Sequence, residues 1–176
     1  MEARTANLLA AAARLVDDAV EENVRREFAF AASAPAALIS IAQQPGLSIE
    51  QLRRILGITH SATVRLVDRL QADGLVTRRK TSGRDVQLAL SARGRRMLQR
   101  VQRARIAAVQ ALIEPLSDEA RAELDSVLCT VLAAQTHSGE DIYRICRLCS
   151  FEVCEREQPC PVALAVQSET TPHGAR

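Results

Sequence analysis

Apolar residues recur at helical spacing along most of the chain. In the first part they fall at Leu8, Leu9, Ala12, Leu15, Val16, Ala19 and Val20, with charged residues between them. This spacing predicts a long amphipathic helix over about residues 5–32. A second helix is expected to end before Pro45 and Gly46, because these residues interrupt a helical pattern.

Two short helices are predicted next, separated by a glycine turn. Ser48 and Gln51 match a capping box at the start of a helix over residues 49–56. Gly57 ends this helix, Thr59 caps another over about residues 60–73, and Gly74 ends that one. The face of the second helix expected to pack carries Thr63, Leu66, Val67 and Leu70. The face expected to be exposed carries His60, Ser61, Ala62, Arg65 and Arg69.

The pattern then changes to that of a hairpin. Apolar and other residues alternate from Asp85 to Leu90, which is the period of a strand, and residues 75–79 form the expected partner strand. Residues 81–83 have turn chemistry. Long helices are predicted over 92–113 and 118–135, on either side of Pro115. The predicted fold is mainly α with a small β-hairpin wing, which is a winged helix-turn-helix joined to further helices.

Charge is concentrated in the middle of this pattern. Residues 48–105 carry fourteen Arg or Lys against four Asp or Glu, whereas the rest of the chain carries nine against seventeen. A basic middle predicts a face that binds a polyanion, and the predicted fold makes double-stranded DNA the expected partner. Small residues allow close approach to bases, and arginines reach phosphates or guanine edges. The candidate DNA-contacting residues are Ser48, Thr59, His60, Ser61, Ala62, Arg65, Arg69, Arg78, Arg79 and Arg84, the last at the wing tip.

Several separated motifs in this region resemble the MarR family. They are Leu56–Thr59, Arg65–Leu70, Asp73–Val76, Arg84, and Leu90–Ser91 with Gly94. The resemblance covers about residues 34–94. It implies a homodimer joined by the N-terminal and C-terminal helices, a near-palindromic operator, and commonly a repressor released by a ligand, metal or oxidant. At the wing, Ser82 stands where the family often has an acidic residue.

Pattern and resemblance together divide the chain into five regions. Residues 1–33 are expected to form a dimerisation helix and residues 34–94 the DNA-binding lobe. Residues 95–137 are expected to form further dimerisation helices, residues 138–166 a cysteine-rich metal-binding segment, and residues 167–176 a disordered tail. The sequence has no signal-peptide pattern and no apolar run long enough to cross a membrane, so a cytoplasmic protein is expected.

Four of the five cysteines lie close together near the C-terminus, at Cys146, Cys149, Cys154 and Cys160. In a cytoplasmic chain such a group indicates metal or redox chemistry rather than a disulfide framework. Two thiolates spaced like Cys146 and Cys149 can reach one metal from a single turn. The fifth cysteine, Cys129, lies among apolar residues and is expected to be a buried core thiol.

The ligand favoured for the four cysteines is an iron–sulfur cluster, with zinc and metal-free thiol switching as alternatives. Zinc sites usually show two tight cysteine pairs, and here only one pair is tight. A cysteine followed by proline, as at Cys160, is familiar from iron–sulfur segments. The first pair and this ending also resemble the two-iron cluster loop of redox-sensing MerR-type regulators, although the middle spacing differs.

The leading hypothesis is a dimeric repressor whose affinity for DNA depends on the state of the cysteine site. One alternative is a regulator of the same type with a structural zinc clip and a small-molecule effector. Another, from a different class, is a redox or metal-handling protein on a winged-helix body. No nucleophile elbow, phosphate loop or metal-binding helix is recognisable, so no enzyme is expected.

Overall fold

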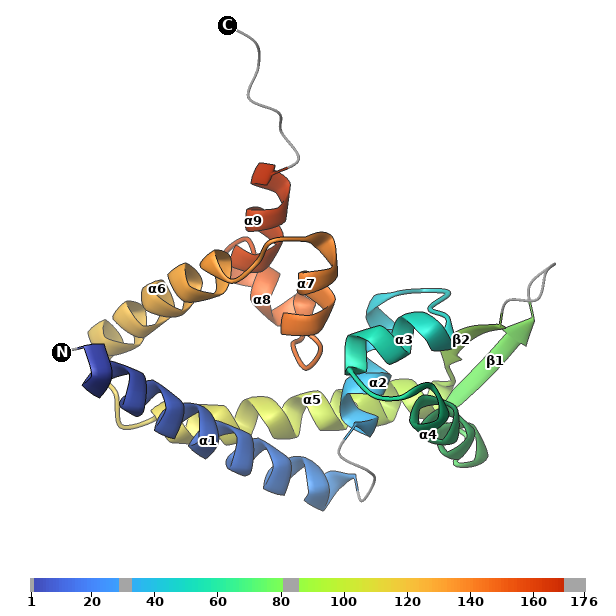
Figure 1. Cartoon of the computed structure of the whole chain (residues 1–176). Coiled ribbons are helices and arrows are strands. Elements are labelled where there is room, and N and C mark those ends of the chain that lie inside the picture. Colours follow the sequence, from blue (N-terminus) through green and yellow to red (C-terminus); the bar gives the residue numbers. More distant parts are fainter. Residues whose placement is uncertain (1, 29–32, 81–85, 170–176) are drawn as a thin grey trace, which may run out of the picture.

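The computed structural model describes residues 2–28, 33–80 and 86–169 (Figure 1). This part of the chain is mostly helical and has a two-stranded antiparallel hairpin, which confirms the predicted fold class. The elements are α1 (Glu2–Glu27), α2 (Ala34–Gln43), α3 (Ile49–Leu56), α4 (His60–Ala72), β1 (Val76–Lys80), β2 (Val86–Leu90), α5 (Ala92–Ile113), α6 (Asp118–Ala134), α7 (Gly139–Ile145), α8 (Phe151–Glu157) and α9 (Pro161–Glu169).

The largest departures from the predicted elements are at the two ends of the chain. Helix α1 ends at Glu27 rather than near residue 32. Helices α8 and α9 were not predicted, and α9 continues to Glu169, beyond the expected start of the tail at residue 167. The predicted wing turn with Ser82 and Arg84, and residues 170–176 of the predicted tail, lie outside the described residues.

A compact lobe is formed by α2, α3, α4, the hairpin and the start of α5 (Figure 1). Helix α2 is apolar around most of its circumference, and its residues from Ala36 to Ile41 are all buried, as expected for a helix enclosed by others. Leu38, Leu52 and Leu70 are fully buried in the same core as Leu88 of β2. This shared core fixes α3 and α4 relative to the hairpin.

The hairpin pairs Val76 with Leu90 at its base and Lys80 with Val86 toward its tip. The segment before α3 extends this small sheet, because the Leu88 N–H donates to the Leu47 carbonyl at 2.9 Å and Ser48 forms a bridge with Gln87. The start of α3 is therefore held by the same strand that supports the wing.

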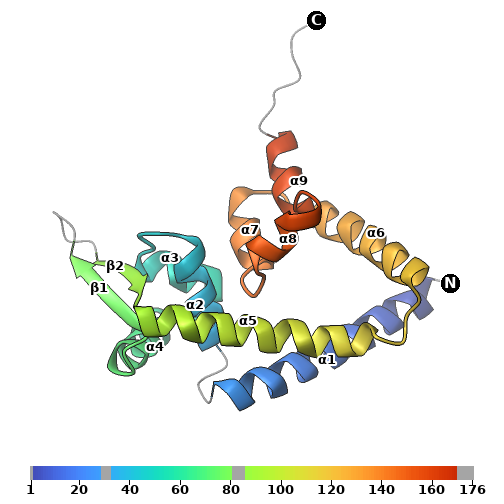
Figure 2. The same cartoon turned by 180° about the vertical axis from the view of Figure 1, so that it is seen from behind.

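Helix α5 carries the chain away from the lobe, and α1 lies alongside it (Figures 1 and 2). Val24 and Phe28, at the end of the first segment, are buried with Val101 of α5. Arg100 of α5 also pairs with Glu27 at 2.8 Å. The part of α1 up to Val16 is different, because its large apolar side chains are exposed. They are Leu8, Leu9, Leu15 and Val16.

The last helices form a second, smaller body. Helix α6 runs from the end of α5 to α7, α8 and α9, which lie above α2 and α3 in Figure 1. Cys146, Cys160 and Val162 are buried together in this body. Helix α7 packs against α3, and α9 packs against α6. No helix in the described ranges is both long enough and apolar enough to span a membrane.

Candidate nucleic-acid interface

The two helices before the hairpin begin and end as the sequence predicts. The Ser48 hydroxyl accepts from the Gln51 N–H at 3.2 Å, and the Gln51 side chain accepts from the Ser48 N–H at 2.9 Å. Gly57 follows α3 with φ +66°, a left-handed conformation that a side chain disfavours. Thr59 caps α4 by accepting from the Ala62 N–H. Local chemistry therefore sets the angle at which α4 leaves α3.

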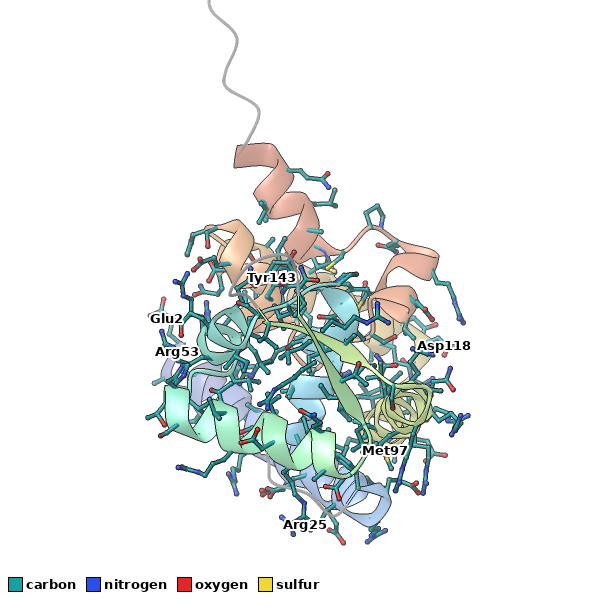
Figure 3. The ribbon with its side chains drawn as sticks, turned by 90° about the vertical axis from the view of Figure 1, so that its right-hand side faces the viewer. Glu2, Arg25, Arg53, Met97, Asp118 and Tyr143 are labelled. Carbon is teal, nitrogen blue, oxygen red and sulfur yellow. The ribbon has the colours of Figure 1, made fainter. Side chains whose placement is uncertain are left out.

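Helix α4 is divided into a packed face and an exposed face. Thr63, Leu66, Val67 and Leu70 are buried, which confirms the predicted packing face. His60, Ser61, Arg65 and Arg69 are exposed, and Ala62 is half-buried. Figure 3 looks onto this end of the molecule, where α4 crosses the front beside the hairpin. The exposed face has the small leading residues and distal arginines that suit a helix entering a major groove.

The basic residues of this face differ in how they are held. Arg65 is exposed and has no carboxylate partner within the described part of the chain. Arg69 pairs with Asp73 at 2.8 Å, at the end of α4. Of the predicted contact residues on the helices, Arg65 is thus the arginine with its charge available to a ligand.

The arginines of the hairpin also differ. Arg79 is exposed. Arg78 is half-buried and pairs with Asp68 of α4 at 2.7 Å, so it joins the wing to the helix in the free chain. Arg84, the predicted tip residue, lies outside the described residues. Contact of these three residues with DNA stays a prediction.

Glu50 is a member of this surface that the sequence analysis did not single out. Its carboxylate accepts two-pronged hydrogen bonds from Arg53 and lies 3.7 Å from Nδ1 of His60. The hydrogen bond from Arg53 holds the pKa of Glu50 below its usual value. The spacing of Glu50 and Arg53 on one helix was readable in the sequence. The approach of His60 was not, because it depends on the turn between the helices.

The four clustered cysteines lie in the small C-terminal body. Cys146 and Cys160 are buried, Cys149 is half-buried, and Cys154 is exposed. The pKa of the Cys149 thiol is raised, first by its hydrogen bond with Cys146, while Cys154 and Arg105 act in the opposite direction. The fold thus brings the thiols of Cys146, Cys149 and Cys154 together.

The four thiols are suitable donors for a soft metal or an iron–sulfur cluster. Their positions in this structure, however, do not form a binding site for either. Within residues 2–28, 33–80 and 86–169, no group of three or more His, Cys, Asp or Glu side chains is positioned to hold a metal ion. The thiols are close neighbours, yet a tetrahedral site would need them to converge on one point.

The prediction for Cys129 is wrong. Cys129 is partly exposed, and α6, which carries it, has no buried residue. Its apolar neighbours Val127, Leu128 and Val131 are exposed, because none of the described residues covers α6 on that side. The pKa of its thiol is raised first by desolvation and then by Asp125, and also by Cys160 and Cys154, which places Cys129 near the cysteine cluster.

The C-terminal body contacts the lobe directly. The Gln43 side chain of α2 donates to the Cys149 carbonyl at 3.0 Å. Tyr143 and Arg144 of α7 line a hollow shared with Arg54 and Ile55 of α3, and Figure 3 labels Tyr143 above the hairpin. The cysteine cluster is therefore joined to the helices that position α4.

A cavity of about 410 Å³ lies between α1, α2 and α5. Its apolar wall includes Val24, Phe28 and Ile39, and Arg105 supplies a positive charge. Leu148, from the cysteine segment, completes the wall. The cavity is large enough for a small organic molecule.

A protein-family model described as the MarR family matches residues 32–85. No curated protein matches the chain in sequence. Among solved structures, a MarR family transcriptional regulator from Rhodococcus sp. RHA1 is 22% identical with a TM-score of 0.59, covering 74% of this chain and 94% of that one. A MarR family protein from Mycobacterium tuberculosis in complex with DNA is 22% identical with a TM-score of 0.61. The match covers 72% of this chain and 95% of that one. CouR from Rhodococcus jostii RHA1 bound to p-coumaroyl-CoA is 23% identical with a TM-score of 0.54. The match covers 70% of this chain and 88% of that one.

Proposed function

We propose that this chain is a MarR-type DNA-binding transcription regulator. The match of residues 32–85 to the MarR family model supports the assignment, as does the likeness of 74% and 72% of the chain to two MarR family structures. The observation that carries it is the division of α4 into a buried face and an exposed face that presents Arg65. A helix presented in this way beside a basic hairpin suits sequence reading in the major groove with support from the wing.

Gel-shift titration with a fragment of the protein's own promoter tests this function. The expected result is a shifted band that competes away with the same fragment but not with unrelated DNA. Affinity should fall as salt rises, because phosphate contacts release bound cations. A redox or metal-handling protein on the same fold would give no sequence-specific shift, and that result would contradict the proposal.

A homodimer is the assembly we propose. Leu9 and Leu15 of α1 are 56% and 58% exposed, and Val127 of α6 is 58% exposed. Large apolar side chains gathered on two helices are typical of a surface that another chain covers. A second copy would cover them in both subunits at once and would present two α4 helices to a near-palindromic operator.

We propose that the cysteine cluster makes this regulator sensitive to its metal or redox state, with an iron–sulfur cluster favoured over zinc. The donor set of four thiols supports either ligand. Anaerobic metal analysis with an absorption spectrum separates the candidates. Iron with visible absorbance is expected, whereas a colourless protein with one zinc per chain would favour a structural clip. If the protein contains no metal, metal-free thiol switching is the remaining candidate.

A small-molecule effector is a second candidate signal, favoured by the cavity between α1, α2 and α5. The likeness to CouR, solved with p-coumaroyl-CoA bound, supports looking for an organic ligand. The apolar wall and Arg105 favour a ligand with an apolar body and one anionic group. Release of the promoter fragment on adding such a compound would support this role.

A further inference from the structure

One turn of the cysteine segment belongs to two sites at once. Residues 146–149 form a tight turn, closed by a hydrogen bond from the Cys149 N–H to the Cys146 carbonyl at 2.8 Å. Its two ends carry thiols of the cysteine cluster. Between them, Leu148 lines the cavity bounded by α1, α2 and α5. A movement of this turn therefore changes the cavity wall and the thiol positions together.

The turn is anchored to α2 by a polar contact. Gln43 donates to the Cys149 carbonyl at 3.0 Å, across more than a hundred residues of sequence. Ile39 lies one helical turn earlier on α2 and lines the same cavity as Leu148. Helix α2 thus holds the turn from one side of the cavity.

The charge in the cavity points to the kind of ligand. Arg25 lines the cavity but is paired with Glu21 of the same helix. Asp17 also lies on the wall. Arg105 has no ion pair within the described ranges and lines the same cavity as Leu148, the residue directly before Cys149. An anionic group would be placed beside Arg105, and so beside the turn.

We propose that an apolar anion in this cavity packs against Leu148 and thereby holds the turn that carries Cys146 and Cys149. The ligand and the cysteine cluster then act as coupled inputs, because each fixes the same backbone turn. Coupling of this kind is reciprocal, so a change at the cysteines alters the affinity of the cavity for its ligand. The coupling between ligand and cysteines does not depend on DNA binding. Its role in regulating transcription does rest on the proposed DNA-binding function.

The test uses the full-length protein, purified anaerobically, and the apolar anion anilinonaphthalene sulfonate as a probe. Alkylation of each cysteine by iodoacetamide is followed by mass spectrometry, with and without saturating probe. Trypsin places Cys146, Cys149 and Cys129 on different peptides, because arginines separate them. We expect the probe to slow alkylation of Cys149 at least fivefold and to leave Cys129 unchanged within twofold.

Two variants locate the effect. Arg105→Ala should weaken probe binding about tenfold, and unchanged binding would overturn the proposal because the probe would then lie elsewhere. Leu148→Ala should still bind the probe but lose the protection of Cys149. Equal protection in Leu148→Ala, or none in the wild-type protein, would also overturn it. Circular dichroism confirms that each variant is folded, and a variant that is not folded is replaced by Arg105→Gln or Leu148→Val, with the same expected directions.

None of these measurements uses DNA. A protein that fails the gel-shift test can still show or lack the coupling, so failure of one proposal is distinguishable from failure of the other. Where the protein does bind its promoter, the probe should also alter the DNA affinity of the wild-type protein more than that of Leu148→Ala.

Discussion

Gly94 in the first turn of α5 lies directly against the backbone of Leu75, at the base of the wing. A Cβ at position 94 would overlap the Leu75 carbonyl oxygen and come within 3.0 Å of its carbonyl carbon. The same carbonyl accepts from the Ser91 N–H at 2.9 Å, and the Ser91 hydroxyl caps α5 by accepting from the Gly94 N–H. This close approach sets where α5 leaves the lobe formed by α2, α3, α4 and the hairpin.

The Gly94→Ala variant is expected to be destabilised by about 1–3 kcal/mol, because the overlapping partner is backbone and α5 must move away. Urea unfolding followed by circular dichroism measures this loss. Gly139→Ala is the matched control, since a Cβ there meets no atom within 4 Å. It should be neutral or slightly stabilising. Equal effects of the two substitutions would show that the approach of Gly94 to Leu75 is not tightly constrained.

Most of the lobe formed by α2, α3, α4 and the hairpin could be predicted from sequence because its signals are local. The capping box at Ser48, the turn at Gly57 and the buried face of α4 each depend on residues a few positions apart. The pairing of Arg78 with Asp68 was not predictable in the same way, because it joins a strand to a helix.

The C-terminal region was harder for a physical reason. Cys129 was expected to be buried because apolar residues surround it in the sequence, yet α6 has no buried residue in the single chain. An apolar pattern predicts which face will be covered but not what covers it. Short helices such as α8 depend on tertiary packing rather than on intrinsic propensity, which is why their boundaries gave little signal.

Arg65→Ala is expected to lower operator affinity about tenfold or more. Arg65 is exposed on α4 and available to a base edge or phosphate, and an arginine contact to a base is worth about 1–3 kcal/mol. Gel-shift titration at several salt concentrations measures the loss and its salt dependence. If Arg65 contacts only a phosphate, the loss should be similar for all DNA sequences and the salt slope should fall by about one.

Arg14→Ala is the control for this experiment. It removes the same charge from α1, where Arg14 is exposed and pairs with Asp18 at 2.6 Å. Its operator affinity should stay within about twofold of the wild type. A similar loss in both variants would mean that net charge, rather than the position of Arg65, determines binding.

Leu128→Glu is expected to weaken or abolish the proposed homodimer. Leu128 is exposed on the uncovered face of α6, and burying a new carboxylate at an interface is strongly unfavourable. Light scattering after size-exclusion chromatography measures the mass over a range of concentrations. Val153→Glu, an exposed apolar position on α8, is the control and should leave the mass unchanged. A wild-type protein that is monomeric at all concentrations would contradict the assembly.

Asp141 should make α7 sensitive to acid. Hydrogen bonds from Arg144, His137 and Ser138 lower its pKa from 3.8 to about 2. Because the folded-state pKa is depressed, the stabilisation is present above about pH 4 and is lost as pH falls toward 2. Unfolding free energies measured between pH 5 and pH 2.5 should therefore fall more steeply in the wild type than in Asp141→Asn. Parallel curves would mean that Asp141 is not selectively held in its charged form.

Gln43→Ala is expected to release the turn that carries Cys149. The substitution removes the hydrogen bond to the Cys149 carbonyl, and a bond of this kind typically contributes about 1 kcal/mol, or roughly a fivefold change in an equilibrium. Alkylation of Cys149 by iodoacetamide should accelerate several-fold, while Cys129 reacts at its original rate. Gln44→Ala is the matched control, because Gln44 is the adjacent glutamine and its side-chain nitrogen is buried without a partner among the residues described. If both variants accelerate Cys149 equally, the effect comes from loosening the end of α2 and not from the contact between Gln43 and the cysteine turn.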